Sequence, residues 1–308
     1  MKLLSPAKIN LFLNILRKRE DGYHEITTLF ERISLSDEIT LLPAKNGITI
    51  STNSKHIPAG PKNLAYQAAA LIKNSYGIKH GITIRIKKRI PVAAGLGGGS
   101  SNAATVLMGL NRLWRLNISK SKLCEFGASL GSDVPFFILE ASFALGKGRG
   151  EILKKIHAPG VKIWHCLVKP SFGISTKEAY QNLGRSLLAP PLVSPANASR
   201  LHRNRKKQGV GLTPAITNVK MLLHSIQKGD SSSLTNCLTN SLEVALNKRV
   251  TIILKIKNEL LRTGALSCLL SGSGPTVFGI YSSEQKASKA ARILKKHKSW
   301  QVFMASTH

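Results

Sequence analysis

The chain has 308 residues, 43% of them hydrophobic, and 45 lysines and arginines against 15 aspartates and glutamates give it a formal net charge of +30. This length and composition suffice for a sizeable core and favour two domains over one. No apolar run approaches the ~20 residues that span a bilayer, and Pro6 and Lys8 interrupt the first apolar residues, so we expect neither a signal peptide nor a membrane partner.

The positive charge raises the question of a nucleic-acid partner. The basic residues are spread through the whole chain, however, and aromatic residues make up only 6% of it. The densest basic run, residues 200–207, lies in a predicted loop and lacks the interleaved aromatics of a stacking platform. We therefore expect no specific nucleic-acid partner, and we note that positive charge also attracts polyphosphate substrates.

The cysteines bear on compartment and on metal binding. Cys124, Cys166, Cys237 and Cys268 are widely spaced, lie in apolar stretches and form no CxxC or metal-ligand pattern. Such cysteines are typical of reduced thiols in a core. We expect a reducing, cytoplasmic location and no metal site built from protein side chains.

Residues 8–15 alternate between apolar and polar side chains, which predicts a strand. Its apolar face begins at Ile9, while Lys8, Asn10 and Phe12 share the other face. On this pattern alone Lys8 is a solvated lysine, the commoner state of a lysine on a strand. A functional role for Lys8 stays open at this point.

A turn then leads into Tyr23 and His24. The pair offers a ring to stack on a planar ligand and an imidazole to hydrogen-bond it. Half-buried aromatic residues at the start of a strand explain the same pattern equally well. Both interpretations stay open.

The next segment combines strands with one helix. Strands are predicted over residues 25–35, 37–42 and 48–51, and an amphipathic helix over residues 62–75. Asn46-Gly47 predicts a hairpin between the strands that flank it. Asn63 stands at the start of the helix as a candidate N-cap.

A glycine-rich loop in residues 91–104 separates a strand at 82–87 from a helix with apolar residues at helical spacing. This order lets backbone N–H groups approach an anion without interference from Cβ atoms, at the positive end of the helix dipole. No Gly-Lys-Ser/Thr follows, and the glycine spacing is not that of a dinucleotide fingerprint. The loop predicts binding of a phosphate chain, and a tight turn with glycines needed only for packing is the alternative.

Asp133 follows a helix predicted over about residues 119–130, which begins at Ser119 and ends at Gly131. Pro135 fits the first turn of a further helix, so Asp133 stands at its start. One interpretation is an N-cap. The other is a general base that the helix N-terminus keeps ionised.

The C-terminal half has a different organisation. Residues 186–215 are rich in Pro, Ser, Asn and basic residues, and we expect a surface excursion there. A Gly-Ser-Gly turn at residues 271–276 lies between two predicted strands. Helices are predicted at about 217–228, 231–242, 248–262 and 284–297, and strands at 161–168, 265–270, 277–281 and 301–304. The whole pattern favours an α+β fold.

Lys8, the loop at 91–104 and the turn at 271–276 together resemble the GHMP kinase superfamily, whose signature is Pro-x-x-x-Gly-Leu-Gly-(Gly/Ser)-Ser-Ser. Within the superfamily the chain is similar to the branch that phosphorylates 4-diphosphocytidyl-2-C-methyl-D-erythritol in the non-mevalonate isoprenoid pathway. The segments that carry this closer similarity are Ser5–Leu11, Asp21–His24, Gly95–Ala104 and Leu130–Pro135. The C-terminal half matches less, through residues 271–276 and a weak correspondence over residues 174–180.

The resemblance implies a two-domain fold with the site in the cleft between the domains. Residues 1–158 would form an ATP-binding domain like the second domain of ribosomal protein S5, and residues 159–308 a ferredoxin-like domain that carries the excursion. The implied reaction transfers the γ-phosphoryl group of ATP to the tertiary 2-hydroxyl of the substrate, with Mg²⁺ bridging phosphate oxygens. We expect a monomer or a weak homodimer.

The resemblance also implies roles for single residues. Asp133 would accept the hydroxyl proton, and Lys8 would keep that carboxylate ionised and stabilise developing charge. The ATP side would be formed by Asn63, near the adenine, and by Pro91, Val92, Ala93, Ala94, Gly95, Leu96, Gly97, Gly98, Gly99, Ser100 and Ser101. The cytidyl side would be formed by Asn10, Tyr23, His24, Thr176, Tyr180, Gly272, Ser273 and Gly274. Tyr180 stands where a phenylalanine is expected, a change that stacking tolerates.

Two other functions remain to be weighed. Another GHMP kinase, for mevalonate-type substrates or homoserine, would not need the run Asp21–His24, because those substrates carry no base to stack. A basic RNA-binding protein on the S5-like fold would not need the glycine loop together with Lys8 and Asp133.

Overall fold

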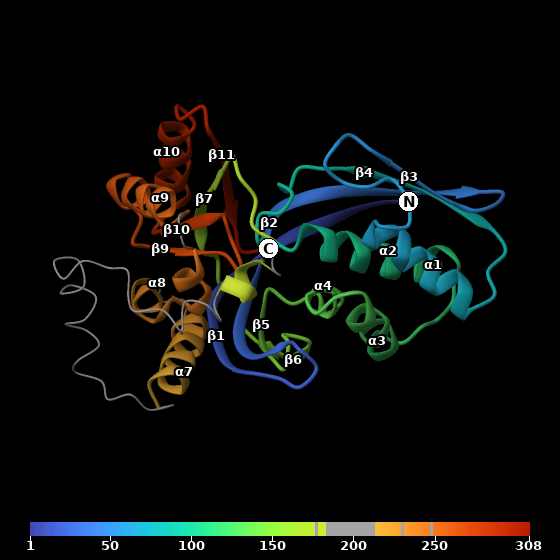
Figure 1. Ribbon diagram of the computed structural model, residues 1–308, viewed down its shortest axis with the longest axis horizontal. Coiled ribbons are helices and arrows are strands. Elements are labelled where there is room, and N and C mark those ends of the chain that lie inside the picture. Colours follow the sequence, from blue (N-terminus) through green and yellow to red (C-terminus); the bar gives the residue numbers. More distant parts are fainter. Residues whose placement is uncertain (176–177, 183–212, 229–230, 247–248) are drawn as a thin grey trace.

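The computed structural model describes the chain apart from residues 176–177, 183–212, 229–230 and 247–248. Within the described residues there are two sheets (Figure 1). The larger has seven strands, with the path β3-β4-β2-β1-β8, with β5 paired to β2 and with β6 paired to β5. The smaller has four, in the order β11-β7-β10-β9. The predicted α+β class is confirmed.

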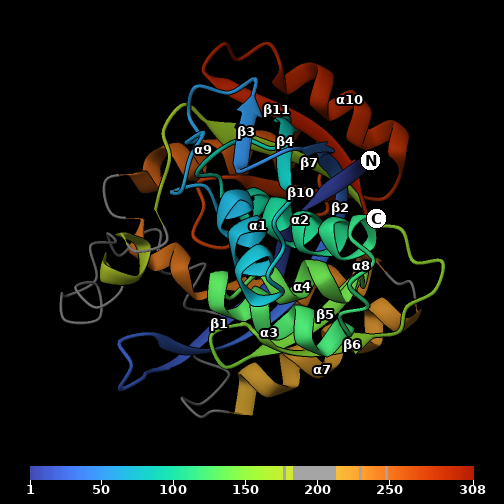
Figure 2. The ribbon, with the colours of Figure 1, turned by 90° about the vertical axis from the view of Figure 1, so that its right-hand side faces the viewer.

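The N-terminal half supplies most of the larger sheet and a layer of helices. Its elements are β1 (Lys2–Lys18), β2 (His24–Ala44), β3 (Ile48–Thr52), α1 (Leu64–Ser75), β4 (Gly81–Lys87), α2 (Gly98–Leu113), α3 (Lys120–Leu130), α4 (Val134–Leu139), β5 (Phe143–Lys147) and β6 (Ile152–Ile156). Figure 2 shows α1, α2, α3 and α4 grouped together in front of the sheet. A buried cluster that includes Leu41, Ile84, Leu107 and Phe136 fills the space between sheet and helices.

The helix starts follow local sequence signals. The Asn63 side chain accepts a hydrogen bond from the Ala65 N–H at 2.9 Å and so caps α1. Ser119 caps α3 in the same way, by accepting from the Lys122 N–H at 3.2 Å. Each cap satisfies a donor that the first turn of a helix leaves open. Both predicted helix starts are therefore confirmed.

The predicted hairpin at Asn46-Gly47 is wrong. The chain does turn there, but β3 pairs in parallel with β4, and β4 lies between β3 and β2. Gly81 at the start of β4 lies so close to Asn46 that a Cβ atom would overlap its backbone. The edge of β2 that a hairpin would use is therefore occupied by a strand from later in the chain. The two strands predicted over 25–35 and 37–42 are one continuous strand, β2.

The predicted face of Phe12 is also wrong. The pairing of β1 with β2 shifts register between Asn10 and Phe12, as at a β-bulge. Beyond the shift, Phe12 packs in one buried cluster with Ile9 and Leu11, because an extra residue exchanges the two faces of a strand. Lys8 and Asn10 are buried as well, with 4% and 1% of their surfaces exposed. The interpretation of Lys8 as a solvated lysine is therefore wrong.

The C-terminal half supplies the smaller sheet and its helices. Its elements are β7 (Trp164–Pro170), α7 (Thr213–Lys228), α8 (Ser231–Leu234), η1 (Thr235–Cys237), β8 (Thr239–Asn240), η2 (Ser241–Ala245), α9 (Val250–Arg262), β9 (Ser267–Leu270), β10 (Val277–Tyr281), α10 (Glu284–Leu294) and β11 (Trp300–Ser306). A buried cluster that includes Ile256, Leu260, Val277 and Leu294 joins α9 and α10 to this sheet. None of the described helices combines the length and apolar character that crossing a membrane requires.

The single helix predicted over 231–242 is wrong. The segment breaks into short pieces, and β8 adds to the larger sheet in parallel with β1, at Phe12 and Leu13. Asn240 causes the break, since its side chain accepts from the Leu242 N–H and donates to two carbonyl groups of the 270–272 segment. These tertiary hydrogen bonds outweigh local helix propensity. The excursion predicted over 186–215 ends earlier, because α7 begins at Thr213, and its residues up to 212 lie outside the described residues.

Candidate active site

A cavity of about 1320 Å³ lies where β1, the glycine loop, the start of α4 and the Gly-Ser-Gly turn come together. Most of the predicted site residues line it. They are Lys8, Asn10, Tyr23, His24, Asn63, Pro91, Val92, Ala93, Ala94, Gly95, Leu96, Gly97, Gly98, Gly99, Ser100, Asp133, Tyr180, Gly272 and Ser273. Segments that are far apart in the sequence thus meet around one space.

Three predicted residues are not in this lining. The hydroxyl of Ser101 is buried against that of Ser5 at 2.8 Å, and its backbone N–H donates to the Gly97 carbonyl. Gly274 lies behind the turn, where a Cβ atom would stand 2.8 Å from a Leu270 methyl group. Thr176 lies outside the described residues.

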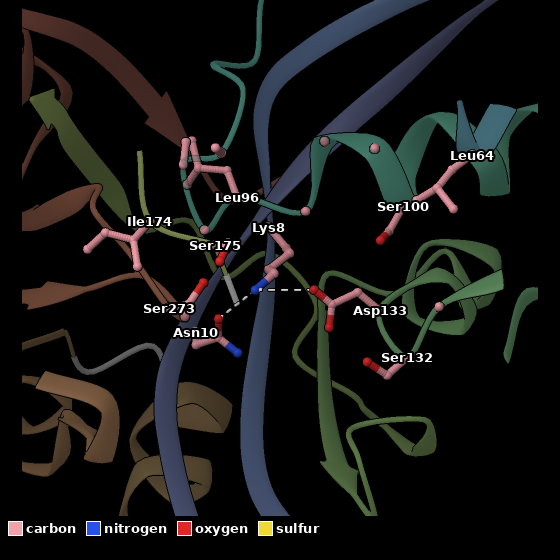
Figure 3. Close-up of a pocket in the computed structure, with 18 of the residues that line it drawn as sticks. Lys8, Asn10, Leu64, Leu96, Ser100, Ser132, Asp133, Ile174, Ser175 and Ser273 are labelled. Atoms are coloured by element: carbon pink, nitrogen blue, oxygen red, sulfur yellow. Dashed lines mark hydrogen bonds and ion pairs between the residues drawn. The ribbon is translucent and has the colours of Figure 1, made fainter. Parts of the chain in front are cut away.

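Lys8 and Asp133 form an ion pair at the centre of the cavity (Figure 3). The Lys8 Nζ lies 3.4 Å from the Asp133 Oδ2 and donates to the Asn10 Oδ1 at 2.7 Å. Asp133 precedes α4, yet its side chain makes no capping hydrogen bond to that helix. The N-cap interpretation is therefore wrong, and the carboxylate, whose side chain is 29% exposed, faces the cavity.

A buried hydrogen-bond chain holds Lys8 in place. The Asn10 Nδ2 donates to the Thr28 Oγ1 at 2.8 Å, and that hydroxyl donates to the Phe12 carbonyl at 2.7 Å. The chain fixes the Asn10 amide so that its oxygen faces the ammonium group. The Lys8 backbone N–H also donates to the Leu96 carbonyl at 3.0 Å, which ties β1 to the glycine loop. Thr28 was not predicted from the sequence.

The glycine loop has no room for side chains at two positions. Gly95 has φ +73°, and a Cβ atom there would lie 2.1 Å from the Ser271 carbonyl oxygen. Gly97 has φ +67°, and its Cβ atom would lie 3.0 Å from both Lys8 Cγ and Phe137 Cζ. The first intrahelical bond of α2 runs from the Ser101 N–H to the Gly97 carbonyl. The N–H groups before it are those that a helix offers to an anion.

The Gly-Ser-Gly turn is fastened directly to the glycine loop. The Ser271 Oγ donates to the Gly95 carbonyl at 3.0 Å. The Asn240 Nδ2 donates to the Leu270 and Gly272 carbonyls, both at 2.8 Å. Figure 3 shows Ser273 across the cavity from Asp133 and Ser132, with Lys8 between them. Asn240, another residue that the sequence did not reveal, thus holds one wall of the site.

The far end of the cavity is aromatic. The His24 and Tyr180 rings stack with centroids 4.9 Å apart and planes 27° apart. Burial, and to a smaller extent the Asp133 charge, raises the pKa of Tyr180 to about 12. Burial, and then the charge of Lys18, lowers the pKa of His24 below its ordinary value. Neutral rings therefore line this end, as a planar heterocycle requires.

Four cations that the sequence did not single out also line the cavity: Lys18, Lys62, Lys88 and Arg149. The Arg149 guanidinium lies 4.8 Å above the Tyr23 ring. Among the described lining residues Asp133 is the one carboxylate. The cavity is therefore suited to polyanionic ligands. A helix N-terminus, a buried cation and a carboxylate in this arrangement suit phosphoryl transfer to a hydroxyl group.

Comparisons with known proteins agree with this arrangement. Residues 63–141 match the GHMP kinases N terminal domain, and residues 222–299 match GHMP kinases C terminal. The chain is 39% identical over 305 residues to the 4-diphosphocytidyl-2-C-methyl-D-erythritol kinase of Syntrophus aciditrophicus (strain SB). This alignment covers 98% of each of the two chains. The predicted superfamily and the closer similarity within it are confirmed.

Solved structures show the same relationship. The crystal structure of a 4-(cytidine 5'-diphospho)-2C-methyl-D-erythritol kinase superposes with a TM-score of 0.76 at 30% identity, over 99% of this chain and 98% of the other. The homoserine kinase from Cytophaga hutchinsonii ATCC 33406 superposes with a TM-score of 0.69 at 20% identity, over 100% of this chain and 94% of the other, and shares the fold. The chain belongs to the GHMP kinase family and, within it, to the 4-diphosphocytidyl-2-C-methyl-D-erythritol kinases.

Proposed function

We propose that this protein transfers the γ-phosphoryl group of ATP to the tertiary 2-hydroxyl of 4-diphosphocytidyl-2-C-methyl-D-erythritol. One observation carries the proposal: the ion pair of the buried Lys8 with Asp133 lies between the glycine loop and the aromatic end formed by His24 and Tyr180. A phosphate donor and a base-bearing acceptor then have separate places, with an acid–base pair between them. Full-length relatives that carry the name of this kinase support it.

The chemical step needs alignment more than basicity. The 2-hydroxyl oxygen attacks the γ-phosphorus while the bond from that phosphorus to the bridging oxygen of ADP breaks, and Asp133 takes the hydroxyl proton. Lys8 stabilises the charge that develops on the transferred group and on the attacking oxygen. A tertiary alcohol is a hindered, weak acid, so correct placement of the reacting oxygen supplies much of the rate.

The donor nucleotide lies with its phosphates at the start of α2 and its adenine toward Asn63 and Leu64. The Asn63 amide already caps α1 and donates to the Pro58 carbonyl at 2.8 Å. We therefore assign Asn63 to shaping the wall of the adenine site, with Pro58 and Leu64 forming its apolar surface.

Mg²⁺ fits the donor set as an ion that is held chiefly by phosphate oxygens. The described residues contain no cluster of three or more His, Cys, Asp or Glu side chains that could hold a metal. The Ser100 hydroxyl at the start of α2 is the side-chain oxygen that the protein would add, because Asp133 is needed as the base. Mg²⁺ commonly keeps several waters and binds through substrate phosphates. When bound, it neutralises charge on the phosphate chain.

The cytidyl end accounts for the second half of the cavity. Cytosine stacks on the rings of Tyr23 and Tyr180, and His24 hydrogen-bonds its edge. Lys18 and Arg149 face the diphosphate that follows. We place the reaction in the cytoplasm, since the four cysteines are free thiols, and we expect a monomer or a weak homodimer.

A substrate panel tests this function. A coupled assay for ADP release would compare the cytidyl compound with mevalonate and homoserine at equal concentrations, each with Mg²⁺ and ATP. We expect turnover with the cytidyl compound alone, because the other two carry no base for the aromatic end. Activity on another alcohol, with none on the cytidyl compound, would contradict the proposal.

A further inference from the structure

A buried ion pair lies beside the glycine loop and has no part in the mechanism proposed above. The Lys88 ammonium donates to the Asp37 Oδ2, and their side chains are 7% and 0% exposed. Lys88 comes directly after β4 and lines the cavity, whereas Asp37 lies on β2 behind it. Burying a pair of charges costs desolvation free energy that the pair itself seldom recovers. A role beyond stability is therefore worth testing.

Asp37 is held independently of Lys88. Its Oδ1 accepts from the Arg89 and Ile90 N–H groups at 2.7 and 2.8 Å, and its Oδ2 also accepts from the Asn102 Nδ2 at 2.9 Å. A carboxylate that accepts three such hydrogen bonds is fixed in place. Asp37 therefore forms a rigid negative anchor between the start of the glycine loop and α2.

Lys88 is only partly satisfied by this anchor. An ammonium group has three N–H donors, and Asp37 is the one hydrogen-bond partner found for it among the described residues. A Cβ atom on Gly98, the first residue of α2, would lie 2.8 Å from the Lys88 Nζ. The ammonium group therefore lies directly beside the helix start, with donors left for a ligand in the cavity.

Two cations thus flank the first turn of α2. Lys8 lies against Gly97, on the side of Asp133, and Lys88 lies against Gly98. An anion bound at this helix start meets backbone N–H groups with a cation on either side. A chain of several phosphates is the ligand that such a wide, doubly charged site suits.

We propose that Lys88 binds the phosphate chain of the donor nucleotide from the Gly98 side of α2, and that Asp37 is the positioning residue that aims it. The proposal rests on the kinase function proposed above. Lys8 then acts at the transferred group, whereas Lys88 holds the phosphates of the ADP portion. The two lysines divide the donor site into a reacting side and an anchoring side.

The competing explanation is that Lys88 only neutralises Asp37. A double-mutant cycle separates the two explanations, because Lys88→Met leaves a buried carboxylate without a cation, whereas Lys88→Met with Asp37→Asn leaves no charge at all. If neutralisation is the whole role, the double variant regains the affinity of the wild type. If Lys88 contacts phosphate, the double variant binds as weakly as Lys88→Met.

The measurement is calorimetric binding of MgADP and of adenosine to the full-length protein. Lys87→Met is the matched control, since Lys87 is the exposed last residue of β4. Lys88→Met should weaken MgADP binding by about 10- to 100-fold, the range for a lost charge-assisted hydrogen bond, and leave adenosine binding unchanged. Asp37→Asn should weaken MgADP binding only when Lys88 is present.

The outcomes are distinct. The role of Lys88 is overturned if Lys88→Met binds MgADP within about twofold of the wild-type affinity. It is also overturned if the double variant regains the wild-type affinity for MgADP. Equal losses for adenosine and MgADP overturn a phosphate contact. If the two single changes weaken MgADP binding independently, so that their effects multiply in the double variant, the positioning role of Asp37 is overturned.

Thermal unfolding of each variant identifies misfolding, and Lys88→Gln replaces Lys88→Met if Lys88→Met unfolds. MgADP binding needs no acceptor, so failure of the cytidyl assay would leave this result intact.

Discussion

Thr28→Val tests whether the buried chain behind Lys8 positions the reaction. Thr28 is fully buried, and valine has nearly the same shape, so the change removes two hydrogen bonds without opening a cavity. The Asn10 amide then has an unsatisfied donor, at a cost of about 1–3 kcal/mol in the free energy of unfolding. The amide is also free to turn its oxygen away from Lys8.

The expected result is a loss in kcat rather than in binding. Misplacement of a reacting group by about 1 Å can cost on the order of 100-fold in rate, so we expect kcat to fall by roughly 10- to 100-fold and KM for ATP to change little. ADP release gives kcat and KM, and thermal unfolding gives the stability loss. Two variants serve as controls: Thr28→Ser keeps the hydroxyl group, and Thr27→Val makes the same change at the half-buried neighbouring residue. The reasoning fails if Thr28→Val turns over like the wild type, or if Thr28→Ser is equally impaired.

Three further predictions concern the site. Asp133→Ala should lower kcat by about 10²- to 10⁴-fold, the usual contribution of a general base, with unchanged thermal unfolding; near-normal turnover would remove Asp133 from that role. Gly97→Ala places a methyl group against the Lys8 side chain at φ +67°, so it should lose about 1–2 kcal/mol of stability and most of its activity. Gly99→Ala, which meets one leucine methyl group at 3.6 Å, should keep its stability, and an equal loss of stability in both variants would contradict the assignment. The lowered pKa of His24, caused by burial and then by a nearby lysine, keeps the imidazole neutral to lower pH than usual. KM for the cytidyl substrate should therefore stay constant from pH 8 down to about 6.5 and rise only below it; a rise already near pH 7.5 would refute this.

Local signals in the sequence predict local structure well here. The caps at Asn63 and Ser119 and the strand at 277–281 depend on neighbouring residues alone, and all three are found where expected. The glycine loop is only partly local. Gly95 and Gly97 have positive φ angles, which glycine adopts most readily, but Ala93 in the same loop also has a positive φ, and the close contacts that exclude a side chain at Gly95 come from the distant Ser271.

Strand pairing and hydrogen bonding between residues far apart in the sequence could not be predicted from such local signals. A strand that arrives more than thirty residues later takes the edge that the Asn46-Gly47 hairpin needed. Asn240 breaks a predicted helix through hydrogen bonds to a turn thirty residues away. The register shift in β1 moves Phe12 into the core, and no local pattern announces it.

The candidate site likewise combines features that the sequence indicates with features that only the structure reveals. From the residues alone, Lys8 and Asp133 each had an ordinary explanation, and the resemblance to a family was needed to bring them together. The structure adds that both ordinary explanations fail, because Lys8 is buried and Asp133 does not cap its helix. Thr28 and Lys88 could not be singled out, because their importance comes from burial beside partners that are distant in sequence.

Phosphorus NMR of the reaction product tests the central proposal most directly. The wild-type protein, Mg²⁺, ATP and the cytidyl substrate should yield ADP and one new phosphomonoester. Its resonance should show no coupling to a proton on the esterified carbon, because the tertiary carbon at position 2 carries none. A new resonance split by such a proton would place the phosphate on another hydroxyl, and ADP release without a new phosphomonoester would contradict transfer to this substrate altogether.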